Sequence, residues 1–272
     1  MANVTDKSLH DLVTAIRKLG VHDHLCLIYE TQEEQFAAVI PFIKIGLERG
    51  ERCVYVVDDN TAAMVIDGMK GAGMDVERAV ESGKLCILSK QETYLKHADF
   101  DPDWMVGFLK QATDEAKAAG FSALRVTGEM TWVLGGVPGT DRLMEYEAKL
   151  NYFFPENDAL AICQYNCNRF PPEIIRDVIA THPLVICGGM VCKNFYYVPP
   201  DDFLEEEQPA KEIERLLANI INRNRVEEEL RERTRELEKR NLELEQLNKA
   251  FVNRELRMEE LKKKIKELEG GK

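Results

Sequence analysis

Six runs of mostly apolar residues, each about as long as a β-strand, alternate with longer segments of helical pattern in the first 200 residues. The runs cover residues 24–30, 53–59, 85–89, 123–129, 160–166 and 184–192. Each is apolar at successive positions, as expected of strands buried on both faces of a parallel sheet. The alternation predicts an α/β fold with three layers (α/β/α), in which helices cover both faces of a mostly parallel sheet.

The segments between the runs have the spacing of amphipathic helices. Apolar residues recur every three or four positions from Phe36 to Leu47, and Gly50 follows where a glycine commonly ends a helix. A further helix with one apolar face is predicted at about residues 8–19, before the first strand. Pro199 and Pro200 then close the α/β region.

The composition changes beyond residue 200. From Pro209 to Glu269 there is no glycine and no further proline, and the segment is rich in Glu, Lys, Arg and Leu. Apolar residues recur at one position of a seven-residue repeat, namely Leu230, Leu237, Leu244, Phe251, Met258 and Ile265. This repeat predicts a long helix, about 90 Å in length, that pairs in a homodimeric coiled coil. The alternative is a single solvated helix, whose apolar stripe would have nothing to pack against.

The second core position of the repeat is partly polar. It contains three arginines, Arg233, Arg240 and Arg254. A polar seam lowers stability but leaves the choice of register open, as a signalling helix requires. In a parallel pair Arg257 would face Lys262, which repels. In an antiparallel pair Glu229 would face Lys264, which attracts, so both orientations stay open.

Charge and cysteine content narrow the class of protein. The net charge of −12 disfavours a nucleic-acid surface or an anionic-membrane surface, because both need cationic attraction. The first residues lack the apolar core of a signal peptide, and no run of about 18 apolar residues occurs. The seven cysteines lie mostly inside apolar runs, which is typical of free thiols in a reducing compartment. We therefore expect a cytoplasmic protein with no nucleic-acid and no membrane partner.

Three separated segments share the motifs of one known family. They are GVHDHLCLIYETQEEQFAAVIPFIKIGLERGERCVYVVDD (residues 20–59), GEMTW (128–132) and CQYNCNRFPPEIIRDVIATHPLVI (163–186). In this order they resemble the MEDS family, the methanogen/methylotroph sensory domain, and the resemblance runs from about residue 19 to residue 200. It implies a cytoplasmic sensor of small hydrocarbon or one-carbon compounds, usually joined to kinase, PAS, GAF or DNA-binding modules. Residues 247–269 resemble the helical connector that follows many sensory domains.

The same region resembles RecA-type and clock-protein-type ATPases, with one difference after the first strand. Those proteins carry there a glycine-rich loop ending in Gly-Lys-Ser/Thr, whose amides and lysine hold the phosphates. Residues 29–35 here read YETQEEQ, with three carboxylates, no glycine and no lysine, and Gly-Lys-Ser/Thr occurs nowhere in the chain. We therefore expect a degenerate RecA-like fold that is not an enzyme, with no catalytic residues and no cofactor.

The candidate ligand site lies at the carboxyl ends of the strands, where open parallel sheets bind ligands. The residues expected there are Tyr29, Glu30, Asp58, Glu129, Trp132, Tyr165 and Arg169. Carboxylates, aromatic rings and an arginine on one rim predict a small-molecule pocket. Glu129 lies near the position of the metal-binding acidic residue in the related ATPases. Its alternative role is a buried ion pair with Arg125 or Arg169.

A second pattern, H-x-H-x-C, occurs at His22, His24 and Cys26. Alternate residues of a strand share a face, so His24 and Cys26 are able to converge on a metal or a ligand. The spacing is not that of a zinc site and no C-x-x-C completes one, so packed thiols and no metal are predicted. His24 matches the opening motif of the family, which implies a role in ligand recognition or in bracing the first strand. The best cysteine–histidine pair for nucleophilic catalysis, Cys163 with His182, has no evident orienting group.

These observations predict a signal-input protein with an N-terminal helix (1–20), a sensory domain (21–204) and a coiled-coil helix (209–269). A small ligand would shift the domain between two packings, and the helix would pass that state to a separate histidine kinase or transcription regulator. One alternative is a degenerate nucleotide-binding enzyme, which tight ATP binding abolished by Glu129→Ala would support. The other is a scaffold without a ligand, which strand ends filled by the domain's own side chains would support.

Overall fold

The computed structural model describes residues 6–97, 99–205 and 209–269. The chain divides into two compact units, one reaching to residue 208 and the other beginning at residue 209. The first unit is an α/β domain, and the second is one long helix.

A single sheet organises the α/β domain, with its described strands in the order β3-β2-β4-β5-β1-β6-β7. Strands β1 to β6 run parallel to their neighbours, and β7 is antiparallel to β6. The strands are β1 (His24–Tyr29), β2 (Arg52–Val57), β3 (Leu85–Ser89), β4 (Leu124–Glu129), β5 (Ala159–Asn166), β6 (Leu184–Cys187) and β7 (Met190–Lys193). The predicted, mostly parallel sheet is therefore confirmed.

The prediction of one continuous strand over residues 184–192 is wrong. The segment forms a hairpin of β6 and β7, because Gly188 and Gly189 turn the chain with φ of 54° and 74°. Positive φ at both central residues is the requirement of a two-residue hairpin turn of type I′. The continuous apolar run conceals this turn, since glycine does not interrupt its hydrophobicity.

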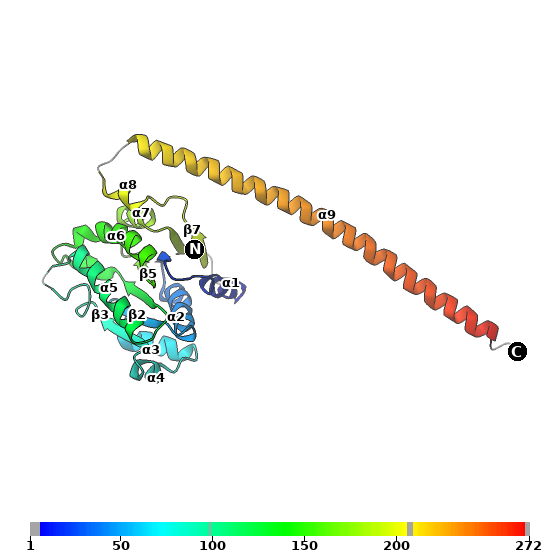
Figure 1. Ribbon diagram of the computed structural model, residues 1–272, viewed down its shortest axis with the longest axis horizontal. Coiled ribbons are helices and arrows are strands. Elements are labelled where there is room, and N and C mark those ends of the chain that lie inside the picture. Colours follow the sequence, from blue (N-terminus) through cyan, green and yellow to red (C-terminus); the bar gives the residue numbers. More distant parts are fainter. Residues whose placement is uncertain (1–5, 98, 206–208, 270–272) are drawn as a thin grey trace. The chain divides into compact units, whose positions relative to one another are not determined.

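Helices cover both faces of the sheet and complete the predicted three layers (Figure 1). One face, called here the α2 face, packs against α1 (Asp6–Ile16), α2 (Gln32–Glu48), α3 (Ala62–Gly71) and α4 (Val76–Glu81). The other, called the α5 face, packs against α5 (Pro102–Ala118), α6 (Leu143–Glu156) and α7 (Pro172–Thr181). Shorter helices are η1 (Thr131–Gly135), η2 (Thr140–Arg142) and α8 (Pro200–Leu204).

Strand β1 shows why the strands lack polar–apolar alternation. Cys26 and Ile28 are buried in the core of the α5 face, while Leu25, Leu27 and Tyr29 are buried in the core of the α2 face. Successive side chains of a strand point to opposite faces, so a strand covered on both sides is apolar at every position.

Helix α2 begins and ends as its sequence indicates. The Thr31 side chain accepts a hydrogen bond from the backbone N–H of Glu34 at 3.3 Å, which caps the first turn. Glu34 in turn accepts one from the backbone N–H of Glu30 at 2.8 Å. At the other end, Gly50 adopts φ of 72°, the left-handed conformation typical of a helix terminus. The Thr31 hydroxyl and the Glu34 carboxylate thus hold the start of α2.

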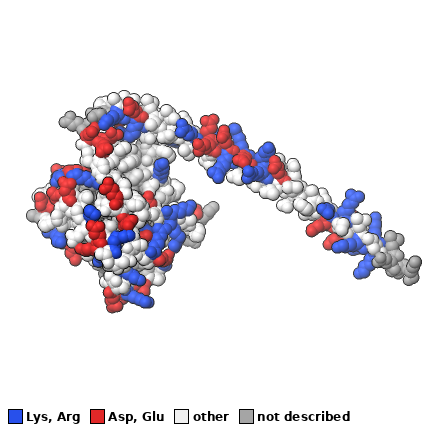
Figure 2. Space-filling model, in the orientation of Figure 1, with Lys and Arg blue, Asp and Glu red and all other residues white. Residues whose placement is uncertain are grey.

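The second unit is helix α9 (Pro209–Glu269), which confirms the predicted long helix. Its apolar heptad side chains are 50–65% exposed, namely Leu230, Leu237, Leu244, Phe251, Met258 and Ile265. Figure 2 shows acidic and basic side chains mixed along α9 and on the visible face of the α/β domain. Within the described part of the chain, no helix has both the length and the apolar content needed to cross a membrane.

Candidate functional site

The predicted ligand-site residues lie on both faces of the sheet. Tyr29 and Glu129 belong to the α2 face, where Tyr29 is part of the core and Glu129 bonds to Tyr55. Tyr165 and Trp132 belong to the core of the α5 face. The structure therefore does not bring Glu129, Trp132 and Tyr165 together in one pocket, because the sheet separates Glu129 from the other two.

Glu129 is fully buried and accepts four hydrogen bonds. They come from the Tyr55 hydroxyl at 3.0 Å, the backbone N–H of Asp58 at 3.0 Å, and both the backbone N–H and the side-chain amide of Asn60 at 2.9 and 2.8 Å. Burial raises the pKa of the Glu129 carboxyl, and the hydrogen bonds from Asn60 act against that increase. The carboxylate oxygens are thus satisfied by the domain itself.

The predicted alternative for Glu129, an ion pair with Arg125 or Arg169, is also wrong. Arg125 is buried, donates to Glu51 and lies over the Phe42 ring. Arg169 pairs with Asp59 at 2.8 Å on the surface. Each arginine therefore has another carboxylate as its partner.

Further hydrogen bonds fill the α2 side of the strand ends. The amide of Asn60 donates to Gln35 at 2.9 Å, and the Gln35 amide donates to Gln164 at 2.7 Å. Asp58 accepts from the Thr131 hydroxyl at 2.6 Å and pairs with Lys90 at 2.5 Å. The strand ends on this side are consequently occupied by side chains of the domain.

Glu30 lies in the turn after β1. Its backbone N–H donates to Glu34, and its carbonyl accepts from the side chain of Asn168 at 3.1 Å. These contacts connect the turn to the start of α2 and to the segment after β5. The turn keeps the acidic character that led us to expect no phosphate loop.

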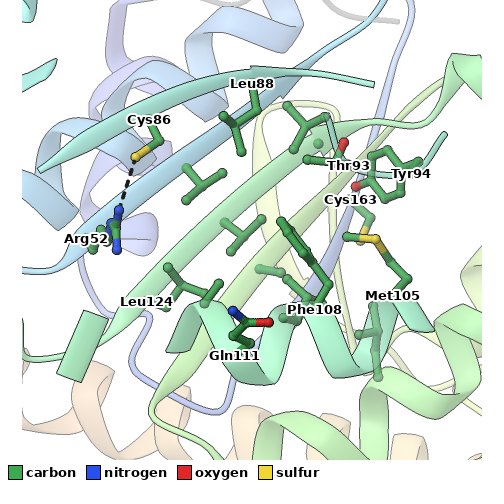
Figure 3. Close-up of a pocket in the computed structure, with 18 of the residues that line it drawn as sticks. Arg52, Cys86, Leu88, Thr93, Tyr94, Met105, Phe108, Gln111, Leu124 and Cys163 are labelled. Atoms are coloured by element: carbon green, nitrogen blue, oxygen red, sulfur yellow. Dashed lines mark hydrogen bonds between the residues drawn. The ribbon is translucent and has the colours of Figure 1, made fainter. Parts of the chain in front are cut away.

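A cavity of about 220 Å³ lies on the α5 face, between the sheet and helix α5 (Figure 3). Its lining comes from strands β2 to β5 and helices α5 and α6, and it is mostly apolar, with Val54, Val126 and Leu150 among its side chains. Two lining residues, Gln111 and Glu115, are exposed and mark its mouth. No prediction from the sequence placed a ligand here.

The buried end of the cavity carries the hydroxyl groups of Thr93 and Tyr94 and the thiol of Cys163 (Figure 3). Gly128 allows Tyr94 to approach strand β4, because a Cβ atom at this position would collide with the Tyr94 hydroxyl. Trp132 stacks on Tyr94 with ring centroids 4.8 Å apart and does not line the cavity. A mostly apolar cavity with a few polar groups is typical of small-molecule sites.

A buried polar cluster lies beside this cavity on the same face. It consists of His24 at the start of β1, Glu147 in α6, Cys163 in β5 and His182 just after α7. The Tyr165 hydroxyl donates to Glu147. Burial lowers the pKa of His24, which favours its neutral form.

The sequence pattern pointed to only part of this cluster. His24 was a candidate from the H-x-H-x-C pattern, and Cys163 with His182 was the best cysteine–histidine pair; the structure brings these three together. Cys26, the expected partner of His24, pairs with Cys163 in the sheet and is not a member of the cluster. Glu147 carries no motif, and it reaches the cluster only through the packing of α6. His22 lies apart, with its ring nitrogen Nδ1 2.7 Å from the carbonyl of Phe154.

The α/β domain matches a known protein family. The family model of the MEDS domain, the methanogen/methylotroph, DcmR sensory domain, matches residues 23–183. The transcriptional repressor DcmR of Methylorubrum extorquens is 24% identical over 168 residues, which cover 60% of this chain and 59% of the repressor. The chain thus spans less than two thirds of that relative's length. Both the cavity and the buried cluster lie within the residues that match the family model.

Among solved structures, a KaiC-like protein from the hyperthermophilic archaeon Pyrococcus horikoshii is similar to this chain with a TM-score of 0.43. The sequence identity is 20%, and the similarity covers 61% of this chain and 70% of that protein.

Proposed function

We propose that this chain, which belongs to the MEDS sensory-domain family because the family model covers more than half of it, is a signal-input protein for a small apolar molecule. The family and the repressor relative support a sensing role. The observation that carries the proposal of a ligand is the cavity on the α5 face.

The size of the cavity favours a small ligand. Pockets for drug-sized molecules measure roughly 300–1,000 Å³, and this cavity measures about 220 Å³. An apolar cavity of about 150 Å³ in another protein stays dry and binds benzene or xenon. A molecule of a few heavy atoms, such as a small hydrocarbon or a one-carbon compound, fits this range.

The chemistry of the lining favours an apolar molecule with at most a weak polar group. Val54, Val126 and Leu150 offer dispersion contacts, and burial of apolar ligand surface contributes about 25 cal/mol per Å². At the buried end, the Tyr94 hydroxyl is able to donate a hydrogen bond to a ligand, and the Thr93 hydroxyl, which donates to the Ser89 carbonyl at 3.0 Å, is able to accept one. A strongly hydrated ligand would lose more solvation than these two hydroxyls replace.

Helix α9 supports a relay to a second chain. Its exposed heptad side chains would be buried by pairing with a second copy, which gives a homodimer. Ligand binding can shift this pairing only if the ligand has different affinities for two packings of the domain. A separate histidine kinase or transcription regulator would then receive the signal from the helix.

The filled strand ends favour one alternative function. The side chains around Glu129 occupy the rim where a ligand was expected, as a docking scaffold without a ligand would require. The two functions differ in one respect, since only a sensor requires saturable binding in the cavity.

The test is titration of the full chain with benzene, followed by NMR of methyl-labelled protein. We expect saturable shifts of the Val54, Val126 and Leu150 methyl groups, with no shift at Leu242 of α9. Ala112→Phe places a ring in the cavity and should abolish the shifts. Ala118→Phe, on the exposed side of the same helix, should leave them unchanged. Shifts that are absent, or equal in wild type and Ala112→Phe, would favour the scaffold.

A further inference from the structure

We propose that His24, Glu147, Cys163 and His182 form a binding site for a divalent transition-metal ion, with Zn²⁺ as the best fit. This inference goes beyond the proposed function, and it stands on a different set of contacts. The four side chains come from β1, α6, β5 and the residue after α7, and the most exposed of them, Cys163, is only 6% accessible. Their ligand atoms all lie within 4.8 Å of one another.

Four of the six distances between these atoms match the edges of a coordination tetrahedron. Zn²⁺ binds nitrogen and oxygen at about 2.0–2.1 Å and sulfur at about 2.3 Å, which gives tetrahedral edges of about 3.3 Å between nitrogen and oxygen and about 3.5 Å to sulfur. Glu147 Oε2 lies 3.3 Å from His24 Nε2 and 3.3 Å from His182 Nε2. Cys163 Sγ lies 3.5 Å from Glu147 Oε2 and 3.7 Å from His24 Nε2.

The hydrogen bonds of His24 leave its inner nitrogen free to bind a metal. Its Nδ1 lies 3.0 Å from Asn151 Oδ1. The Asn151 amide group donates to the Thr181 carbonyl at 2.8 Å, which orients Oδ1 toward the histidine. Nδ1 therefore carries the proton, and Nε2 presents a lone pair to the cluster.

His182 has the same arrangement. Its Nδ1 lies 2.7 Å from the Val178 carbonyl, so this nitrogen also carries the proton. Its Nε2 is fully buried, has no hydrogen-bond partner and points toward Glu147 Oε2. Two nitrogen lone pairs directed at one carboxylate oxygen repel it unless a cation lies between them. Metal-bound histidines usually donate their other N–H to a carbonyl or a carboxylate, as both do here.

Glu147 is oriented in a similar way. The Tyr165 hydroxyl donates to Oε1, which leaves Oε2 for the metal. Two imidazoles, one carboxylate and one thiolate form a donor set that suits Zn²⁺ and related ions. Because all four ligands come from the protein, the site is closed and would connect β1, β5, α6 and α7 beside the cavity that Cys163 also lines.

The test uses the full chain, treated with a chelator and then titrated with Zn²⁺ or Co²⁺. We expect one metal ion per chain by native mass spectrometry and a higher melting temperature with Zn²⁺. Co²⁺ should produce a thiolate-to-metal charge-transfer absorption and the intense visible bands of tetrahedral cobalt. His182→Gln should weaken binding by more than about 100-fold, beyond the loss expected for an outer-shell partner.

Two cysteine variants identify the ligand. Cys163→Ser should remove the charge-transfer band. Cys26→Ser should retain it, because Cys26 is buried on the same face and pairs with Cys163 in the sheet but lies outside the cluster. Wild-type protein that binds neither ion at one equivalent would overturn the site, and so would a band that survives in Cys163→Ser. If Cys163→Ser does not fold, the wild-type stoichiometry and charge-transfer band still decide the question.

Discussion

Asn60 contacts both oxygens of the Glu129 carboxylate: its backbone N–H lies 2.9 Å from Oε2, and its side-chain amide lies 2.8 Å from Oε1. This pair closes the strand ends on the α2 face, where a parallel sheet commonly binds its ligand. The space for a ligand is on the opposite face, between the sheet and α5.

Replacing Asn60 should therefore affect stability and not ligand binding. Asn60→Ala removes three side-chain hydrogen bonds: those that Asn60 donates to Glu129 and to Gln35, and the one that it accepts from Gln32. We therefore expect a loss of about 2–3 kcal/mol in the free energy of unfolding in urea. Benzene binding should not change. The control Asp59→Ala removes only an exposed pair with Arg169 and should cost at most about 1 kcal/mol. Asn60→Ala as stable as wild type would show that the Glu129 contacts are not structural.

Tyr165 should act on the proposed metal site through Glu147. Tyr165→Phe removes the hydroxyl that orients the carboxylate and keeps the ring. We expect metal affinity to fall about 10- to 100-fold, as for other outer-shell partners. The thiolate-to-cobalt band should remain, because Cys163 is unchanged. Unchanged affinity would mean that Glu147 needs no orientation by Tyr165, whereas loss of the band would mean that the variant disturbs more than the carboxylate.

The heptad face of α9 should control association. Leu237 and Leu242 are almost equally exposed, at 56% and 58%, but only Leu237 lies on the predicted seam. Leu237→Asp should shift the full chain toward monomer in sedimentation equilibrium, because it places a charge in the seam. Leu242→Asp should not. Equal effects of the two variants would argue against pairing through this face.

Acid should weaken one surface ion-pair network. Arg142 and Lys149 lower the pKa of Glu145 from 4.5 to about 2, with Arg142 as the larger cause. A carboxyl whose pKa is lower in the folded state contributes stability above its unfolded pKa and loses it as the pH falls through the folded pKa. The free energy of unfolding of wild type should therefore exceed that of Glu145→Gln by about 1 kcal/mol at neutral pH. This difference should begin to shrink below pH 4.5 and disappear near pH 2; a difference that is constant with pH would exclude the ionised pairs as its source.

Much of the fold follows from local patterns. The apolar runs located the strands because both faces of the sheet are covered, and the absence of glycine and proline indicated α9. The hairpin of β6 and β7 was missed because Gly188 and Gly189 interrupt an apolar run without changing its hydrophobicity. The order of the strands depends on contacts between distant segments, which a single sequence does not reveal.

The site depends on register, which explains why its residues were grouped wrongly. Glu129 pairs with Gln164, so Tyr165 is one residue out of step and points to the opposite face. A shift of one residue reverses the face of a side chain, and no local pattern reports it. Glu147 and His182 come from separate helical segments with no spacing motif, so only their packing brings them to His24.

The most direct test of the central claim, that the α5-face cavity accepts a small apolar molecule, is a crystal structure of the full chain under xenon pressure. Xenon enters apolar cavities without hydrogen bonds. We predict an anomalous peak among Val54, Val126 and Leu150 that is absent in Ala112→Phe and present in Ala118→Phe. Well-ordered crystals with xenon bound only elsewhere, or with no xenon, would contradict the claim.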